Sequence, residues 1–183
     1  MQSPLDKLYS KTLSLLEKEK IPYLLIGGLA AGVLGEPRMT QDIDLIIFTP
    51  KKSVPEIIKK AAKEGFQANP KVILNDVELK GAFRLDFNGL WIDIIISSTE
   101  FEESAFKRKK QITLLGRKTF IPSAEDLILL KLIPGREKDM LDIKSIIERQ
   151  KGKLDRKYLE KWAQKLSDEA ENMRIWNTLK KVL

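Results

Sequence analysis

The chain has 183 residues, of which 43% are hydrophobic and 32% are charged, and its formal net charge is +7. This composition is typical of a globular protein with one domain, or one domain with a helical extension, and excludes an intrinsically disordered chain. Cysteine and histidine are both absent, which excludes disulfides, Cys/His zinc sites, thiolate nucleophiles and histidine bases, so any metal must be bound by oxygen atoms.

The first third of the chain predicts helices that alternate with strands. Leucines at helical spacing mark the first helix, and short apolar runs bounded by Pro and Gly mark the strands. The second strand ends in residues that are apolar on both faces, which is typical of a strand buried on both sides. In chain order we predict a helix over residues 5–18, a strand over 23–26, a short helix over 29–34, a strand over 42–48 and a helix over 53–64.

A β-hairpin is predicted next, around the dipeptide Asn88-Gly89. This pair favours the type I′ turn of a two-residue hairpin loop, and it is flanked by strand-like runs over 82–87 and 90–96. The two-residue loop determines the register of the strands. The alternating apolar residues then share one face of the hairpin, which helices must cover.

After a further strand pair over 111–115 and 118–121, the chain is predicted to be helical. Ser123 with Asp126 resembles a capping box that opens a helix. This change from strands to helices is the only candidate boundary in the chain.

Asp155 and Ser167 are predicted to be the N-caps of two later helices. We therefore expect an α/β core over residues 1–121 and a C-terminal helical region over 122–183 that packs on the core.

Asp42 and Asp44 stand at positions i and i+2 at the head of the second strand, so their side chains share one face. Two adjacent carboxylates repel each other unless a cation lies between them, and no basic residue is placed locally to neutralise both. A divalent ion bound by oxygen, Mg²⁺ or Mn²⁺, is the simplest explanation. An Asp-x-Asp pair alone also occurs in glycosyltransferases, calcium loops and surface turns.

Gly27 and Gly28 end a strand and open a helix, an arrangement that can direct backbone N–H groups and the positive helix end at a phosphate. Arg38 and Thr40 precede the carboxylates and can hold further phosphate oxygens, Arg38 through its planar fork. Gly-Gly after a strand is more often an ordinary turn. Together with the carboxylates, however, these residues predict a triphosphate site beside a metal site.

The order of Gly27-Gly28, Asp42-x-Asp44 and Asp93 resembles the DNA polymerase β-like nucleotidyltransferase superfamily. Members of that superfamily carry a Gly-Gly or Gly-Ser turn, then an Asp-x-Asp pair, then a third carboxylate on a neighbouring strand. The resemblance implies a mixed β-sheet with helices packed on one side. It also implies that the three aspartates bind two Mg²⁺ ions, of which one holds the triphosphate and one lowers the pKa of the attacking hydroxyl.

The resemblance covers residues 23–96 and includes one departure, because many members carry Ser where this chain has Leu29. Phosphate contact would then rely on backbone N–H groups and on Arg38. Asp93 would ligate the second metal or act as the base. The hairpin register places Arg84 opposite Asp93, and we expect an ordinary cross-strand ion pair worth well under ~1 kcal/mol.

Lys131 lies in an apolar helix and must reach solvent or an anionic partner. Asp139 and Asp142 follow one turn apart, so an ion pair between two helices is the simplest explanation. The stretch is also similar to the type IV abortive-infection toxin group of nucleotidyltransferases, which carry a helical Lys and then an Arg-x-Lys/Arg-Asp-x-x-Asp run. That similarity implies that Lys131 and Asp142 are needed for activity, with the lysine offsetting charge on the pyrophosphate.

These residues predict a Mg²⁺-dependent (or Mn²⁺-dependent) nucleotidyltransferase that moves a nucleoside monophosphate from a triphosphate such as ATP to an acceptor hydroxyl. The net charge of +7 favours RNA as the acceptor, for example a tRNA 3′ end, although Lys and Glu on exposed helices would give the same charge. The toxin-like similarity implies a cognate antitoxin.

Three alternatives remain: a protein adenylyltransferase, a nucleotide-binding antitoxin or regulatory module without turnover, and an Asp-x-Asp glycosyltransferase. Three repelling carboxylates argue against a simple binding module. The short chain and the Gly-Gly turn argue against a glycosyltransferase.

We expect a cytoplasmic protein without membrane contact. No stretch approaches the roughly 18 apolar residues of a membrane span. The segment from Met1 to Asp6 lacks the basic and then apolar order of a signal peptide.

Overall fold

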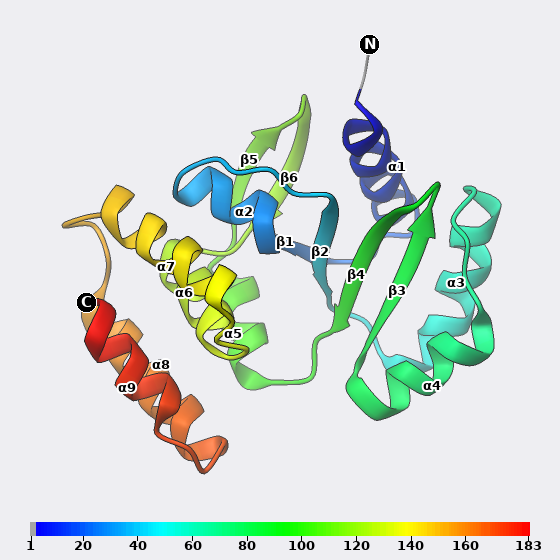
Figure 1. Ribbon diagram of the computed structural model, residues 1–183. Coiled ribbons are helices and arrows are strands. Elements are labelled where there is room, and N and C mark those ends of the chain that lie inside the picture. Colours follow the sequence, from blue (N-terminus) through cyan, green and yellow to red (C-terminus); the bar gives the residue numbers. More distant parts are fainter. Residues whose placement is uncertain (1–2) are drawn as a thin grey trace.

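The computed structural model describes residues 3–183, and its central feature is a four-stranded sheet of mixed direction with the order β1-β2-β4-β3 (Figure 1). β2 is antiparallel to β1 and parallel to β4, and β4 is antiparallel to β3. The strands are β1 (Tyr23–Ile26), β2 (Asp42–Ile47), β3 (Ala82–Phe87) and β4 (Leu90–Ile96). The predicted α/β fold is confirmed; residues 1–2 of the expected core lie outside the described part.

Helices and a second, two-stranded sheet pack against this sheet. In the first part of the chain the helices are α1 (Pro4–Lys18), α2 (Gly27–Leu34), α3 (Val54–Lys63), α4 (Pro70–Lys80) and α5 (Glu100–Lys107), with a 3₁₀ turn, η1 (Lys51–Ser53), before α3. The second sheet pairs β5 (Lys110–Leu114) with β6 (Arg117–Ile121). The chain then continues through α6 (Ala124–Leu132), α7 (Glu137–Arg149), α8 (Arg156–Glu169) and α9 (Arg174–Val182). Across residues 3–183, no helix combines the length and apolar character that crossing a membrane requires.

The hairpin of β3 and β4 has the register that its turn predicts. Asn88 and Gly89 both have positive φ, at 55° and 80°, as a type I′ turn requires. One face of the hairpin is buried, and Phe87 there packs against Phe66 with the ring centroids 5.3 Å apart. The opposite side of the sheet, which we call the open face, carries Asp42 and Asp44 from β2, Arg84 and Asp86 from β3, and Trp91, Asp93 and Ile95 from β4.

Two helices, α4 and α5, were not predicted. Both begin with strong local caps: the Asn69 side chain accepts hydrogen bonds from the first turn of α4, and Thr99 with Glu102 forms a capping box at α5. α4 buries only Ile73 and Val77, so its apolar periodicity is weak.

The prediction that Ser167 is the N-cap residue at which a helix begins is wrong, because α9 begins at Arg174 after Met173. Ser167 lies inside α8 and is fully buried, and its hydroxyl accepts a hydrogen bond from the backbone N–H of Trp176 at 3.0 Å. The helix continues past it because Leu166 packs into the core. Asp155 is confirmed as the N-cap of α8, since its side chain accepts from the N–H of Tyr158.

The capping box predicted at α6 forms only in part. Ser123 accepts a hydrogen bond from the N–H of Asp126. The Asp126 carboxylate instead accepts from the Ser123 hydroxyl, Arg108 and Tyr158, and the residue is fully buried. It therefore joins the C-terminal end of α5 to α6 and α8.

α6 and α7 lie beside α2, which places them near one end of the sheet (Figure 1). Two polar contacts hold α7 there: Ser145 accepts from the N–H of Glu36 at 2.6 Å, and Gln150 donates to the carbonyl of Leu34 at 2.9 Å. Gly35 is tightly packed, because a Cβ on it would come within 2.6 Å of the Ser145 hydroxyl. The predicted division into a core over residues 1–121 and a C-terminal helical region over residues 122–183 stays a prediction.

Candidate active site

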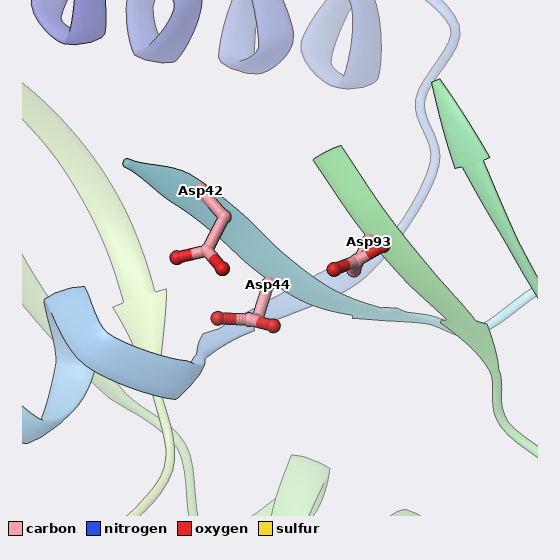
Figure 2. Close-up of side chains that lie close together, drawn as sticks. All are labelled: Asp42, Asp44 and Asp93. Atoms are coloured by element: carbon pink, nitrogen blue, oxygen red, sulfur yellow. The ribbon is translucent and has the colours of Figure 1, made fainter. Parts of the chain in front are cut away.

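Three carboxylates meet on the open face of the sheet. Asp42 and Asp44 are the first and third residues of β2, and the parallel register places Asp44 opposite Asp93 of β4. Figure 2 shows the three side chains gathered beside the two strands. One oxygen atom from each lies within 4.8 Å of the others, and all three residues are half-buried.

These oxygens fit a single divalent cation. Two oxygens on opposite sides of a Mg²⁺ ion, each about 2.1 Å from it, lie about 4.2 Å apart. Carboxylate oxygens that lie within 4.8 Å of one another reach that spacing with small side-chain movements. The donor set consists of oxygen alone, which suits Mg²⁺ or Mn²⁺.

The charge around Asp44 also favours a cation. Burial, and then the neighbouring charges of Asp42 and Asp93, raise the pKa of Asp44 to about 6. Lys131 and Lys138 act in the opposite direction but do not cancel the increase. The site therefore has an excess of negative charge that a bound cation would neutralise.

The glycine turn lies directly against this cluster. α2 begins at Gly27, whose neighbour Ile26 pairs with Asp44 across β1 and β2. Gly27 has a φ of +67°, and a Cβ on it would overlap the Asp44 carboxylate. A Cβ on Gly28 would lie 2.9 Å from the Thr40 hydroxyl. Only glycine allows the start of α2 to approach the carboxylates this closely.

The other predicted phosphate-binding residues are placed differently. Thr40 donates a hydrogen bond to Asp42 at 2.5 Å and so positions that carboxylate. Leu29 packs its side chain partly into the core and is not among the residues that line the neighbouring cavity, so only its backbone is available to a phosphate. Arg38 lines the cavity, but its guanidinium is bound to Asp142.

A cavity of about 370 Å³ adjoins the carboxylates. Its polar part contains the glycine turn, two of the three aspartates and several basic side chains, and its apolar part comes mainly from α6 and the residues after it. The polar lining residues are Gly27, Gly28, Arg38, Asp42, Asp44, Glu102, Lys131, Arg136, Lys138 and Asp139, and the apolar ones are Ile26, Ile95, Leu127, Leu130, Ile133 and Pro134. Such a cavity can accept a molecule with a polyanionic end and an apolar end.

A buried ion cluster forms one wall of the cavity. Lys131 Nζ lies 2.7 Å from Asp142 and 3.5 Å from Asp139, and all three residues are less than 7% exposed. Arg38 donates two hydrogen bonds to Asp142, at 2.6 and 2.9 Å. Burial alone would raise the pKa of Asp142, but the hydrogen bonds from Arg38 and Lys131 outweigh it and hold that pKa below its usual value. The predicted ion pair between two helices is confirmed.

Arg84 and Asp93 form the cross-strand pair that the hairpin register predicts. Arg84 donates to both carboxylate oxygens of Asp93, with distances of 2.6 and 2.7 Å. The Arg84 side chain is 54% exposed, so most of it remains in solvent. The pair lies on the side of Asp93 away from β2 and leaves the cluster of three carboxylates intact.

Two features of the site were missed from the sequence. Lys138 lines the cavity and makes no ion pair within residues 3–183; its place in the Arg-x-Lys-Asp run was the available signal. Leu127 and Leu130 of α6, and Ile133 directly after it, make up half of the apolar lining, and in the sequence they cannot be distinguished from core residues.

Comparison with known proteins gives a family and a fold. A family model described as "Nucleotidyltransferase of unknown function (DUF6036)" matches residues 4–182. No curated protein matches the sequence. Similar solved structures include the solution structure of the antibiotic-resistance factor ANT(2'')-Ia, with 13% identity and a TM-score of 0.65 over 93% of this chain and 97% of that one.

A crystal structure of ANT(2'')-Ia in complex with adenylyl-2''-tobramycin gives 17% identity and a TM-score of 0.58, over 80% of this chain and 89% of that one. The crystal structure of the lincosamide antibiotic adenylyltransferase LnuA, bound to lincomycin, gives 18% identity and a TM-score of 0.54, over 79% of this chain and 96% of that one. At these identities the similarity shows a shared fold.

Proposed function

The chain belongs to this family of nucleotidyltransferases, and from that premise we propose that it transfers a nucleoside monophosphate from a nucleoside triphosphate to a hydroxyl group of RNA, with Mg²⁺. One observation carries the proposal. Oxygens of Asp42, Asp44 and Asp93 lie within 4.8 Å of one another, and the first two aspartates line a cavity that also holds the glycine turn and basic side chains. Carboxylates that can hold a cation beside a cavity with a polar, partly basic lining suit phosphoryl chemistry.

In this proposal Asp42, Asp44 and Asp93 hold Mg²⁺, or Mn²⁺ in its place. The cation supplies positive charge that neutralises phosphate oxygens and lowers the pKa of the attacking hydroxyl. Asp93, at the outer side of the cluster, either completes the metal site or accepts the hydroxyl proton. The acceptor oxygen bonds to the α-phosphorus while the bond to the bridging oxygen breaks, and pyrophosphate leaves.

The remaining predicted residues bind the triphosphate. The N–H groups of Gly27, Gly28 and Leu29 lie at the start of α2, where the helix dipole favours phosphate. Arg38 adds positive charge from the loop before β2. Lys131, in the buried cluster behind the cavity, offsets charge that develops on the leaving pyrophosphate.

The acceptor is proposed from charge. The net charge of +7 favours a polyanion, and a tRNA 3′ end offers a free ribose hydroxyl. The toxin-like arrangement of Lys131 and Asp142 supports a toxin role with a cognate antitoxin as partner. Adenylylation of a protein is the nearest alternative.

A small antibiotic is a second candidate acceptor, favoured by one observation: the match to the antibiotic-resistance factor ANT(2'')-Ia, which is also known in complex with adenylyl-2''-tobramycin, covers 93% of this chain.

The test is a transfer assay with each α-labelled nucleoside triphosphate, Mg²⁺ and a choice of acceptors: total tRNA, a protein extract, tobramycin and lincomycin. We expect label in RNA with the wild type, and none with Asp44→Asn or with EDTA. Label that enters only protein or only an antibiotic would refute RNA as the acceptor. The absence of transfer to any acceptor, with intact nucleotide binding, would support a binding module without turnover.

A matched control is available on the same face of the sheet. Asp86 is a half-buried carboxylate of the open face that lies outside the metal cluster. Asp86→Asn should therefore retain transfer under conditions in which Asp44→Asn has lost it.

A further inference from the structure

The net positive charge of the protein is concentrated in one segment, residues 104–124. This segment contains six lysines and arginines and no acidic residue, so its formal charge is +6, compared with +7 for the whole chain. It comprises the C-terminal end of α5 and the hairpin of β5 and β6, which packs beside β1 (Figure 1). The charge that favours a polyanionic partner therefore has a defined place on the surface.

Four of the six basic residues in this segment carry unpaired charges. Arg108 pairs with two acidic residues of α6, and Arg117 pairs with Glu17 of α1. The residues that form no ion pair, within the described part of the chain, are Lys107, Lys109, Lys110 and Lys118. Glu103 of α5 is exposed one helical turn before Lys107, so it offsets one of these four charges. Three lysine charges remain available to a ligand.

A surface cavity of about 270 Å³ lies where this segment meets the start of β1. Lys20 and Lys109 line it, together with the half-buried rings of Phe106 and Phe120. We call the surface formed by these four residues the basic hollow. One acidic residue, Glu17, also lines the cavity, but its carboxylate is the one that Arg117 already binds. The hollow thus combines an apolar floor with an excess of positive charge.

Two aromatic rings hold the side chain of Lys109 at the hollow. Its Nζ lies 3.9 Å from the centre of the Phe106 ring and 5.6 Å from that of Phe120, and such contacts attract and position an ammonium group. Nζ donates one long hydrogen bond, to the carbonyl of Phe106 at 3.5 Å, so two of its three donors are free. Lys118 lies two residues before Phe120 on β6 and therefore on the same face of the strand. Lysines placed side by side suit a phosphate chain, which carries charge at regular intervals.

The basic hollow lies away from the carboxylates of the candidate site. Tyr23 lines the cavity at the start of β1, and the glycine turn follows the end of this strand, about 13 Å further along it. The open face itself carries four aspartates and one arginine, Arg84, which is already bound to Asp93. Because that face is acidic, affinity for a polyanionic acceptor has to come from another surface.

We propose that the basic hollow, together with Lys118, binds phosphate groups of the acceptor RNA at a distance from the hydroxyl that is modified. The inference rests on the proposed function and adds the surface that holds this substrate. Phosphate contacts of this kind position a nucleic acid without reading its sequence. A chain of phosphates can enter the hollow, whereas a flat layer of lipid headgroups cannot reach the half-buried Lys109.

The test measures binding without turnover. A 5′-labelled tRNA is titrated with the protein in Mg²⁺ without nucleoside triphosphate, at several salt concentrations, and its fluorescence anisotropy is followed. Lys109→Gln combined with Lys118→Gln should weaken binding about tenfold, and the slope of the logarithm of the binding constant against that of the salt concentration should fall by about 1 for each lysine removed. Lys109→Arg combined with Lys118→Arg keeps both charges and should retain most of the binding.

A charge-matched control lies at the opposite edge of the sheet. Lys63 of α3 and Lys71 of α4 are exposed, and neither forms an ion pair within residues 3–183. α4 packs against β3, whereas β6 packs against β1, and these two strands are the two edges of the sheet. Lys63→Gln combined with Lys71→Gln should bind tRNA as the wild type does, with an unchanged salt slope. An equal loss in both glutamine double variants would show that net charge alone attracts RNA, and would overturn the inference.

Wild-type affinity after the substitution of Lys109 and Lys118 by glutamine would also overturn the inference. So would binding of vesicles of phosphatidylcholine and phosphatidylserine that depends on these lysines, without binding of tRNA. Binding of tRNA that depends on them, without label transfer when nucleoside triphosphate is added, would refute the proposed function alone. Transfer to tRNA with a KM for tRNA that the glutamine substitutions leave unchanged would refute this inference alone.

Discussion

Arg38 and Asp142 are 104 residues apart in the sequence and meet through two hydrogen bonds, from Nε at 2.6 Å and from Nη2 at 2.9 Å. The same carboxylate accepts a hydrogen bond from Lys131 at 2.7 Å. Asp142 belongs to α7, whereas Arg38 lies in the loop before β2 and lines the cavity, so the contact ties α7 to the candidate site. This geometry supports a role for Asp142 in positioning the side chains of Arg38 and Lys131.

Asp142→Asn should therefore lower both stability and transfer. The substitution leaves the buried Lys131 with only the longer contact to Asp139, and it frees Arg38. Removing one partner of a buried ion pair costs about 3–5 kcal/mol, and the partial exposure of Arg38 reduces this to about 2–3 kcal/mol. Urea denaturation measures the change. Glu160→Gln, which breaks an exposed pair with Lys180, should leave the midpoint unchanged. Equal effects of the two substitutions would contradict the positioning role.

Gly27→Ala should abolish transfer, because the added Cβ would displace the Asp44 carboxylate. Gly81→Ala is a close control: Gly81 has a φ of +64° against +67° for Gly27, but a Cβ there would meet nothing within 4 Å. We expect Gly81→Ala to lower the free energy of unfolding by about 1–2 kcal/mol, through backbone strain alone, and to retain transfer. Gly27→Ala should lower the free energy of unfolding by more than Gly81→Ala does. The prediction fails if both variants lose the same stability and remain active.

Asp44→Asn should stabilise the protein in the absence of metal, and it should remove the stabilisation that Mg²⁺ gives the wild type. In EDTA the variant should be more stable than the wild type by about 1–3 kcal/mol, because it removes a buried charge beside Asp42 and Asp93. Added Mg²⁺ should raise the melting temperature of the wild type and not that of Asp44→Asn. Asp86→Asn should keep the Mg²⁺ response. A destabilised Asp44→Asn protein in EDTA would show that the carboxylate is stabilised by protein contacts and needs no cation.

Lys138→Met should weaken triphosphate binding without a loss of stability. Lys138 lines the cavity and, within residues 3–183, makes no ion pair that its removal could break. We expect KM for the nucleotide to rise about tenfold, in line with one lost charge-assisted phosphate contact. Lys144→Met removes a lysine from the same helix that does not line the cavity, and it should leave KM unchanged. Similar KM values for the two variants would exclude a phosphate contact by Lys138.

Short-range patterns predicted much of the sheet and part of the site. The turn at Asn88-Gly89 determined the hairpin register, so the pairing of Arg84 with Asp93 followed from counting residues. Asp42 and Asp44 share a face because of the two-residue period of a strand. The helix α4 was missed because only two of its residues are buried and its periodicity is correspondingly weak. Ser167 was misassigned because a serine inside a buried helix and a serine at a helix start look alike without their partners.

The sequence by itself determined the hairpin of β3 and β4, the two-aspartate strand and the glycine turn, because turn chemistry and strand alternation act within a few residues. Only the tertiary structure decided which distant residues meet at the site. The contact of Arg38 with Asp142, the apolar lining from α6 and the place of Asp93 beside Asp44 depend on how α7 docks on α2 and how β4 aligns with β2. These contacts join segments far apart in the chain, and no local period encodes them.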